Sequence, residues 1–503
     1  MRNFSGPGRL NFPESDAGHK GRYFRASSIP WWLQSPKQFT GIHQNLNMST
    51  VESLLDLDRN HHVHGQTNLR QHQQNGPVAM VVEGHGVYIR TSDGRELIDG
   101  FSGLGCASLG YHNDRLAEAA KRQMDTLPFA PTFYGRSHPK VAQLAARLVG
   151  MTPVSMDRVM FQCSGSEAND AMIKFLWYRN IGRGQPHRRK LISRWRGYYG
   201  NTVAAVSLSG QPHMHQRFGL LMEEFLKLST PNYYRFHQDG EREREFSARM
   251  AQEFENLVLE TGPDRIAAFV AEPMQSGGGA ILPPSGYWDE MQAVIRKYDI
   301  HFHVDEVVCG FGRTGHWWGA EAFNLQPDSI SCAKALTAAF FPLSALMFKE
   351  DFYQDMMHNS DVVGVLGHGF TYSGHPVGAA VALEALDIYE EMDLIGRVRE
   401  VSGHFLDGCH ALMDHPLVGD ARGIGLFCGI ELVKDKKTRE QFDPGLKVGQ
   451  RVQDAAHAEG LYLRSIPPDR ISFMPPLVIR RSEIDIALGR LKRALDRVWK
   501  EVR

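Results

Sequence analysis

A lysine and an aspartate each follow a strand-like run in the middle of the chain. Asp305 follows the run at 300–304, and Lys334 follows the run at 329–333 among apolar residues. Burial lowers the pKa of a lysine and frees its amine to form a Schiff base. A carboxylate such as Asp305 is the partner that a pyridinium nitrogen needs. The pair therefore predicts pyridoxal phosphate chemistry, although a lysine at a strand end can also extend to solvent.

The stretch around this pair closely resembles the signature of the class III (omega) aminotransferases, which are pyridoxal phosphate enzymes of fold type I. The match covers the acidic pair that Asp305 begins, the turn GFGRTG at 310–315, Pro327 with Asp328, and the Ala-Lys that ends at Lys334. The resemblance implies that Lys334 binds the cofactor aldehyde and that Asp305 holds the ring nitrogen. Both residues are therefore the expected catalytic residues.

A glycine-serine pair at a predicted helix start is suited to bind an anion. Gly165 and Ser166 begin the helix after a strand, where unpaired N–H groups and the helix dipole favour negative charge. An ordinary capping box of Ser166 with Asn169 fits the same residues. The resemblance implies that Gly165 and Ser166 hold the cofactor phosphate. It also implies that Thr371 reaches the phosphate of the other subunit, so we expect a homodimer with a composite site, and further pairing to a tetramer stays open.

Three residues are expected to surround the cofactor ring. Tyr198 lies among glycines at a sheet end, where an aromatic side chain can stack on a ring. The resemblance places Val307 on the opposite ring face, and strand alternation predicts that it points to the same side as Asp305. Glu272 ends another strand, and the resemblance places it near the phenolic side of the cofactor. Without the resemblance, a strand-terminal glutamate is more often a surface charge.

Two residues are expected to contact the substrate. The resemblance implies that Arg464 binds a substrate carboxylate, for which a guanidinium is the natural partner; a solvated arginine at a strand end, or Arg422 in this role, stays open. Gly105 stands where the amine:pyruvate branch commonly has Trp, and an absent indole would admit a larger amine. Val308 replaces the Gln of the ornithine-type branch, which favours the branch that pairs amines or ω-amino acids with pyruvate.

Composition argues against several other classes of protein. The 503 residues carry a formal net charge of −1, which gives no field to attract nucleic acid or an anionic membrane. The sequence contains no run of 18 unbroken apolar residues, so we expect no membrane span. We also expect no signal peptide. Six cysteines occur without a CxxC pair. This pattern favours reduced thiols in the cytoplasm over a disulfide scaffold.

The first 47 residues lack hydrophobic periodicity and are rich in Gly, Pro, Ser, Asn and Gln. They fit a disordered tail or an arm that packs on a neighbour. Met48 is an equally good candidate for the biological start. Ser49 or Thr50 is expected to cap the helix that follows, with Glu52 as the capping-box partner.

Four histidines, His61, His62, His64 and His72, gather after this predicted helix. Histidine clusters bind metals when cysteines or carboxylates accompany them at suitable spacing. We see no such partner in the sequence. We therefore interpret the cluster as solvated or locally packed and expect no metal ligand in this chain.

Strand-like and helical runs alternate from residue 159 onward. This alternation predicts an α/β fold with a mostly parallel sheet and helices on both faces. Fold type I adds a smaller α/β domain built from both chain ends. We expect an extension or arm at 1–47, a segment joining the small domain at 48–100, a large cofactor-binding domain at 101–375 and a small domain at 376–503.

The resemblance covers about residues 55–498, and its motifs occur in family order. It predicts a transaminase that moves an amino group from an amine or ω-amino acid to pyruvate or another α-keto acid. The mechanism is ping-pong through Schiff bases, with Lys334 as the general acid and base. Decarboxylation, amino-group mutation and elimination occur on the same fold and stay open. A non-catalytic relative is the alternative from a different class.

Overall fold

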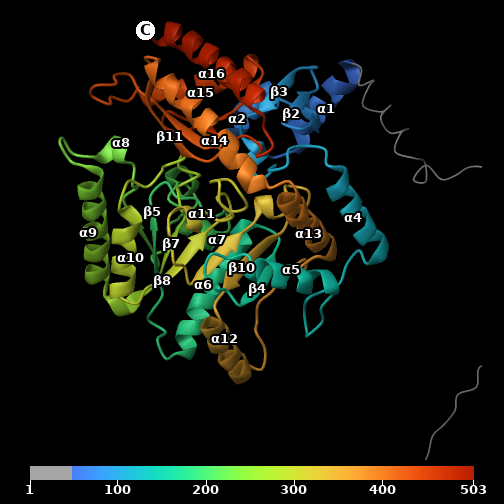
Figure 1. Cartoon of the computed structure of the whole chain (residues 1–503), viewed down its shortest axis with the longest axis vertical. Coiled ribbons are helices and arrows are strands. Elements are labelled where there is room, and N and C mark those ends of the chain that lie inside the picture. The colour runs from blue at the N-terminus through green and yellow to red at the C-terminus, as the bar shows by residue number, and fades with distance from the viewer. Residues whose placement is uncertain (1–47) are drawn as a thin grey trace, which may run out of the picture. The chain divides into compact units, whose positions relative to one another are not determined.

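The structure is a computed structural model that describes residues 48–503. The two interpretations of residues 1–47 lie outside the described residues. The described chain forms two compact units, residues 48–80 and Val81–Arg503 (Figure 1). The predicted domain boundaries at residues 100 and 375 stay predictions.

The first unit is a pair of helices, α1 (Met48–His61) and α2 (Leu69–Asn75). The side chain of Asn68 caps α2 by accepting a hydrogen bond from the Gln71 N–H. The predicted cap of α1 is wrong, because the helix already begins at Met48 and therefore contains Ser49 and Thr50.

A seven-stranded sheet forms the centre of the second unit, in the order β4-β10-β9-β8-β7-β5-β6. Its strands pair in parallel except for β10, which runs antiparallel to both of its neighbours. This arrangement confirms the predicted mostly parallel sheet. The strands are β4 (Arg158–Gln162), β5 (Lys190–Arg194), β6 (Phe225–Leu228), β7 (Ile266–Ala271), β8 (His301–Asp305), β9 (Ser329–Cys332) and β10 (Ser344–Phe348).

Helices cover both faces of this sheet, because its central strands are apolar on both sides. Alternate residues of β7 show the two faces. Ala268 and Val270 join an apolar cluster with α6, α7 and α12, whereas Phe269 joins a second cluster with α9, α10 and α13. Figure 1 shows α9 and α10 side by side, and α13 beside α4 and α5. These helices are α4 (Asp114–Thr126), α5 (Pro139–Val149), α6 (Gly165–Gly182), α7 (Val203–Leu208), α9 (Glu243–Thr261), α10 (Tyr287–Lys297), α12 (Glu350–Val363) and α13 (Pro376–Glu391).

A four-stranded sheet combines residues from both chain ends in the order β1-β2-β3-β13. Leu461 on β13 lies opposite Ile98 on β3 in a parallel pair. This pairing confirms the fold-type expectation that both ends build one smaller part. The strands are β1 (Val81–His85), β2 (Tyr88–Thr91), β3 (Glu96–Asp99) and β13 (Leu461–Tyr462).

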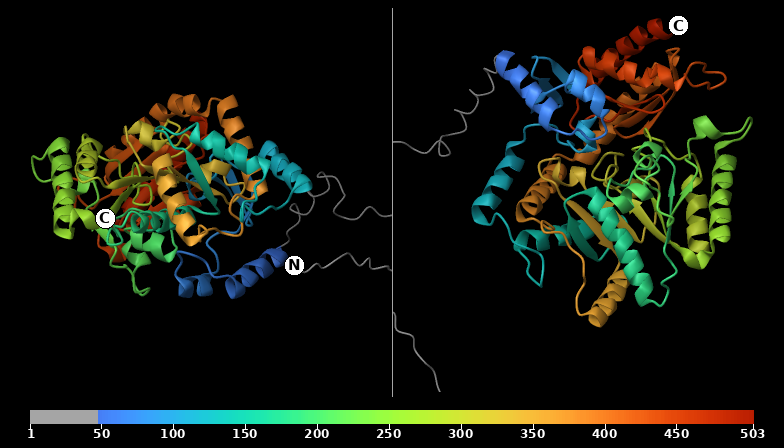
Figure 2. Two further views of the ribbon diagram at one scale, coloured as in Figure 1. Left: turned by 90° about the horizontal axis from the view of Figure 1, so that it is seen from below. Right: turned by 180° about the vertical axis from the view of Figure 1, so that it is seen from behind.

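A third sheet, in the order β11-β12-β15-β14, packs with the C-terminal helices (Figure 2). The sequence predicts one strand over 461–464. The structure divides it, because Tyr462 pairs with β3 whereas Arg464 pairs with β15. The elements are β11 (Val418–Ile424), β12 (Phe427–Leu432), β14 (Arg464–Ile466), β15 (Arg470–Phe473), α14 (Leu394–Ala411), α15 (Val448–Ala458) and α16 (Arg481–Val502).

Three short helices lie elsewhere in the second unit: α3 (Ser102–Gly105), α8 (Tyr233–Phe236) and α11 (Gly319–Ala322). Among the described helices, none has the length and apolar character needed to cross a membrane.

Candidate active site

Lys334 lies directly after β9, at the first position of a short 3-10 turn, Lys334–Thr337. Its φ is +51°, a backbone conformation that costs a residue other than glycine about 1–3 kcal/mol. Burial lowers the pKa of the Lys334 amine, and the nearby carboxylate of Asp305 opposes this shift. The side chain keeps partial exposure. The amine is therefore shifted toward its neutral form.

Asp305 ends β8 and is 4% exposed. Its Oδ2 accepts a hydrogen bond from Asn169 Nδ2 at 2.7 Å, and its Oδ1 accepts one from the Val307 N–H at 2.9 Å. Burial is the larger cause, and the nearby carboxylate of Glu272 the smaller one, of a rise in the pKa of Asp305 to about 7. No cation donates a hydrogen bond to this carboxylate within the described residues, so a cationic ligand would complete its environment.

Glu272 follows β7 and is 2% exposed, which excludes the surface-charge interpretation. Its Oε1 accepts from the Tyr198 N–H at 3.1 Å, and its Oε2 accepts from the Ser276 N–H at 2.7 Å and from the Ser276 hydroxyl. Burial raises the pKa of Glu272. Two buried acids, Glu272 and Asp305, therefore lie near each other at neighbouring strand ends.

Asn169 connects these strand ends to helix α6, a role that the sequence analysis missed. Its Nδ2 donates to Asp305 and to the Tyr199 carbonyl, each at 2.7 Å, and its Oδ1 accepts from Ser331 Oγ at 2.9 Å. The sequence analysis treated Asn169 only as a cap partner. An amide in an otherwise apolar helical stripe, beside Ala168 and Met172, was the signal that could have identified it.

The N-terminus of α6 presents two unpaired N–H groups. Ser164 is the N-cap, because its Oγ accepts from the Glu167 N–H. The predicted capping pair of Ser166 with Asn169 is therefore wrong. The N–H groups of Gly165 and Ser166 have no hydrogen-bond partner among the described residues. Ser166 Oγ accepts from the Asn201 N–H at 3.0 Å, so the helix start lies against the loop that follows Tyr199.

Val307 lies beside this helix start. A Cβ built on Gly165 would be 3.0 Å from a methyl group of Val307. The strand-alternation argument for Val307 was wrong, because β8 ends at Asp305 and Val307 lies in the turn that follows. Its N–H bond to Asp305 fixes its position instead.

Tyr198 and Tyr199 differ sharply in their surroundings. Tyr198 is 38% exposed, and a Cβ on Gly277 would be 2.5 Å from its Cβ, so Gly277 packs tightly behind it. Burial raises the pKa of the Tyr198 hydroxyl, with Arg464 and Asp305 near enough to add charge effects. Tyr199 is buried, and its hydroxyl donates to the Val270 carbonyl. Tyr198 therefore offers a ring to a ligand, whereas Tyr199 belongs to the core.

Arg464 begins β14, and its guanidinium carbon lies 5.7 Å from the centroid of the Phe101 ring. Among the described residues, no carboxylate or carbonyl accepts a hydrogen bond from it. Arg422 is different, since it forms ion pairs with Asp420 at 2.6 Å and Glu431 at 2.8 Å. Arg464 is therefore the arginine that is free for a substrate carboxylate.

Gly105 ends the short helix α3 and is buried with a φ of +77°. A Cβ at this position would be 2.8 Å from Met474 Cε and 3.9 Å from a methyl group of Val308. The buried carboxylate of Asp99 holds this loop by accepting from the Gly103 N–H at 2.6 Å. The neighbour of Gly105, Cys106, is near enough to Lys334 to influence its pKa. Gly105 therefore lies close to the lysine.

Thr371 lies exposed in a turn before α13. Neighbouring aromatic side chains are also exposed, including Phe129 at 41% and Tyr372 at 60%. The centroids of these two rings lie 5.9 Å apart. A single chain does not test whether Thr371 completes the site of a second subunit, so the composite site stays a prediction.

Comparison with known proteins identifies the family. The model of the class III aminotransferases matches residues 70–495. This chain belongs to the class III aminotransferases. It is 39% identical to a diaminobutyrate–2-oxoglutarate transaminase from Halomonas elongata, over 90% of this chain and 97% of that protein.

Two solved omega transaminases share the fold of this class III aminotransferase. One, from Pseudomonas jessenii in complex with PMP, is 40% identical with a TM-score of 0.88, over 89% of this chain and 99% of the other. The other is a thermostable variant with tryptophan replaced by glycine, engineered for asymmetric synthesis of enantiopure bulky amines. It is also 40% identical with a TM-score of 0.88, over 90% and 100% of the two chains.

Class III aminotransferases use pyridoxal 5'-phosphate, and the residues described above fit it. No cation among residues 48–503 donates a hydrogen bond to the buried Asp305 carboxylate, and a protonated ring nitrogen would supply that donor. The N–H groups of Gly165 and Ser166 suit a phosphate, and the exposed face of Tyr198 suits a flat ring. When bound, the cofactor supplies a conjugated electron sink for charge that develops on the substrate carbon.

Proposed function

We propose that this transaminase moves an amino group from an amine or ω-amino acid to pyruvate in a ping-pong reaction. One observation carries the proposal. The amine of Lys334 lies close to a buried acid pair, Asp305 and Glu272. Arg464, which forms no ion pair with any described residue, lies near enough to affect the pKa of this amine. A primary amine and a carboxylate are the two groups that such a site would bind.

Lys334 has two tasks in this proposal. Its amine would hold the cofactor through the aldehyde group. Once released by the amine donor, the same amine would accept and return the proton at the substrate carbon. A lowered pKa suits this task, because a protonated amine cannot accept a proton. Asp305 holds the proton of the ring nitrogen in place, and Asn169 and Val307 orient its two oxygens.

Around the ring, Tyr198 and Val307 would lie on opposite faces, and Glu272 would lie beside the phenolic edge. Gly165 and Ser166 would hold the phosphate. In a homodimer, Thr371 would add a hydroxyl to the phosphate in the site of the other subunit. Six free thiols, four of them buried, support a reducing compartment such as the cytoplasm.

Arg464 and Gly105 determine the substrate class in this proposal. A bidentate contact from Arg464 would select a keto acid or the carboxylate of an ω-amino acid. With no side chain at Gly105, only the flexible Met474 side chain would need to move to admit a bulky amine. A relative in which a tryptophan is replaced by glycine was engineered for the synthesis of bulky amines. Pyruvate is our preferred acceptor because Val308 takes the place of the ornithine-type Gln. The Halomonas relative acts with 2-oxoglutarate, so that acid is the second candidate.

The test is an absorbance scan of the purified holoenzyme with single donors, without keto acid. The panel contains a small amine, a bulky aryl amine, an ω-amino acid and taurine. We expect the visible cofactor band to disappear with a subset of donors and to return with pyruvate faster than with 2-oxoglutarate. A band that persists with every donor, while a substrate is decarboxylated or loses a leaving group, would exclude transamination. Lys334→Ala is the control, and an unchanged band in this variant would refute the lysine assignment.

A further inference from the structure

Helices α1 and α2 have a polar centre. Between residues 51 and 80, His72 is the only side chain that is buried, with 6% exposure, and no apolar side chain in this range is buried. Leu57 is 53% exposed and Leu69 is 56% exposed. A helix pair without an apolar core gains little stability from burial, and small segments of this kind commonly depend on a metal or a disulfide.

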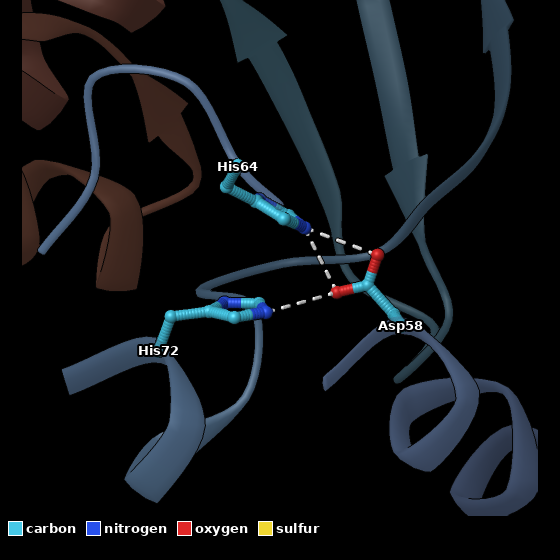
Figure 3. A group of neighbouring side chains, drawn as sticks. All are labelled: Asp58, His64 and His72. Atoms are coloured by element: carbon cyan, nitrogen blue, oxygen red, sulfur yellow. Dashed lines mark hydrogen bonds and ion pairs between the residues drawn. The ribbon is translucent and has the colours of Figure 1, made fainter. Parts of the chain in front are cut away.

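Three potential metal ligands meet at this centre. They are Asp58 near the end of α1, His64 in the connection and His72 on α2, and their donor atoms all lie within 4.8 Å of one another. Figure 3 shows both imidazole rings directed at the Asp58 carboxylate. The sequence analysis was wrong to find no carboxylate for the histidines, because Asp58 precedes His61 by less than one helical turn and lies within hydrogen-bond distance of His64.

The distances suit a tetrahedral cation. His64 Nε2 lies 2.9 Å from Asp58 Oδ2, and His72 Nε2 lies 3.5 Å from the same oxygen. Donors at about 2.1 Å from a tetrahedral Zn²⁺ lie roughly 3.4 Å from one another. The two separations from Asp58 Oδ2 are therefore within about 0.5 Å of this spacing. All three donor atoms lie within 4.8 Å of one another, so side-chain rotation can bring them onto one ion.

His72 supplies a second, independent indication. Its Nε2 is buried and makes no hydrogen bond to any described residue, although the ring points at Asp58. The 3.5 Å contact with Asp58 Oδ2 is not a hydrogen bond, so this buried nitrogen is incompletely satisfied without a ligand. Its ring lies 4.1 Å from the His64 ring, centroid to centroid, so the two imidazoles lie side by side. Neutral imidazoles are the form that binds metal.

A third histidine, His62, also contacts the Asp58 carboxylate. His62 Nδ1 lies 3.0 Å from Asp58 Oδ1, the oxygen farther from His72. Hydrogen bonds to a ligating carboxylate fix its orientation and are common around metal sites. Two imidazole nitrogens and one carboxylate oxygen form a donor set that suits Zn²⁺ and neighbouring transition metals, and it does not suit Mg²⁺ or Ca²⁺.

We propose that Asp58, His64 and His72 bind one Zn²⁺-like transition-metal ion that fastens α1 to α2. The bound ion replaces the missing apolar core of this helix pair. A solvent molecule completes the tetrahedron, because among the described residues these are the only three ligands in the group. The site lies within residues 58–72 and uses none of the residues assigned to transamination, so its role is structural.

The test is a titration of the full-length, untagged holoenzyme, freed of metal with a chelator, with Co²⁺ and then with competing Zn²⁺. We expect one equivalent of Co²⁺ to give the visible absorption of a tetrahedral complex, and Zn²⁺ to displace it. Removal of a residue that only hydrogen-bonds to a metal ligand already weakens metal binding by about 10- to 100-fold. Asp58→Asn, His64→Gln and His72→Gln should weaken it at least as much. His61→Gln, an exposed histidine in the same segment, is the matched control and should bind like the wild type.

A second measurement protects the test against misfolded variants. Limited proteolysis of the same proteins should show that Zn²⁺ slows cleavage within residues 58–76 in the wild type and in His61→Gln, and leaves the cleavage rate of His72→Gln unchanged. Equal Co²⁺ binding in the wild type and the three ligand variants would place the metal elsewhere and overturn the proposal. Absence of a one-equivalent complex in the wild type would also overturn it.

Discussion

Asn169 Nδ2 donates a hydrogen bond to Asp305 Oδ2 over 2.7 Å. Asn169 lies about one turn after Gly165 on α6, so the helix whose first N–H groups suit a phosphate also holds the acid at the end of β8. Its Oδ1 accepts from Ser331, which lies on β9, the strand before Lys334. One amide therefore links the elements that carry the proposed phosphate-binding N–H groups, Asp305 and Lys334.

We predict that Asn169→Ala weakens binding of pyridoxal phosphate by about 10- to 100-fold, because a hydrogen bond to a charged group contributes about 1.5–3 kcal/mol. Fluorescence titration of the cofactor-free protein measures this effect. Asn180→Ala is the matched control. Asn180 is also a buried amide on α6, but it donates to the Arg188 carbonyl outside the site. Equal cofactor affinity in the two variants would contradict the proposed role of Asn169.

The pKa of Asp305, raised to about 7, predicts how the stability of the cofactor-free protein depends on pH. The unfolded carboxyl releases its proton near its ordinary pKa of about 3.9, whereas the folded one keeps it to about 7. The folded state therefore binds more protons in this window. Stability should fall as pH rises from about 4 to 7, by at most about 1.4 kcal/mol per pH unit from this group.

Urea unfolding of the cofactor-free wild type and of Asp305→Asn across this pH range isolates the contribution of Asp305. The slope of the wild type should exceed that of the variant. Saturation with pyridoxal phosphate should reduce the difference, because a cationic partner lowers the pKa of the carboxyl. Identical slopes in the two cofactor-free proteins would show that Asp305 is already ionised.

Lys334→Ala should slow loss of the cofactor band with any donor by at least about 10²- to 10⁴-fold, which is the usual contribution of general acid and base catalysis. Stopped-flow absorbance measures the single turnover. Lys227→Met is the control, since Lys227 is also partly exposed and burial lowers its pKa to about 7. Its ammonium group donates to the Ser193 hydroxyl on β5 and to the carbonyls of Ser207 and Leu208 on α7, away from β9. A loss of rate in both variants would indicate a general effect of buried lysines.

Arg464→Leu should raise the KM for pyruvate by about 10- to 100-fold, because the keto acid loses a charged hydrogen-bond partner. The half-reaction of a donor without a carboxylate should keep its rate. Steady-state kinetics with pyruvate and single-turnover kinetics with an aryl amine separate the two effects. An unchanged KM would assign carboxylate binding to another group.

Gly105→Ala and Gly105→Trp should lower the rate with a bulky aryl amine progressively, while a small amine is affected less. The added side chain must displace the Met474 side chain, whose Cε would be 2.8 Å from the new Cβ. A side chain at a φ of +77° also costs about 1–2 kcal/mol. Gly103→Ala carries a similar strain at a φ of +66° and is the control. A rate ratio of the two amines that changes equally in both alanine variants would exclude a role of Gly105 in substrate size.

Much of the large sheet could be predicted because its strands are short apolar runs between helical patterns. The predicted run at 329–333 corresponds to β9, and the run at 300–304 corresponds to β8. The antiparallel strand β10 could not be predicted in this way. Its direction depends on pairing with Cys332 on the preceding strand β9 and with Gln162 on the distant strand β4. Hydrophobic periodicity carries no information on such partners.

The site was predicted unevenly for the same reason. Strand ends that carry Lys334, Asp305 and Glu272 converge at one edge of a parallel sheet, so their proximity follows from the fold class. Asn169 and Asp58 were missed as contacts, because each acts across a tertiary contact whose partner lies on another element. A buried amide is visible in the sequence only as a polar residue in an apolar stripe.

The parallel pair of Ile98 on β3 with Leu461 on β13 has a consequence for biosynthesis. A ribosome that adds about 5–20 residues per second needs on the order of half a minute to travel from the first residue to the second. During that time the β1-β2-β3 ribbon has an open edge, to which a nascent neighbour on the same messenger can pair. Release of a ribosome before residue 461 would leave that edge permanently open. Such truncated chains are expected to be substrates for chaperones and proteases.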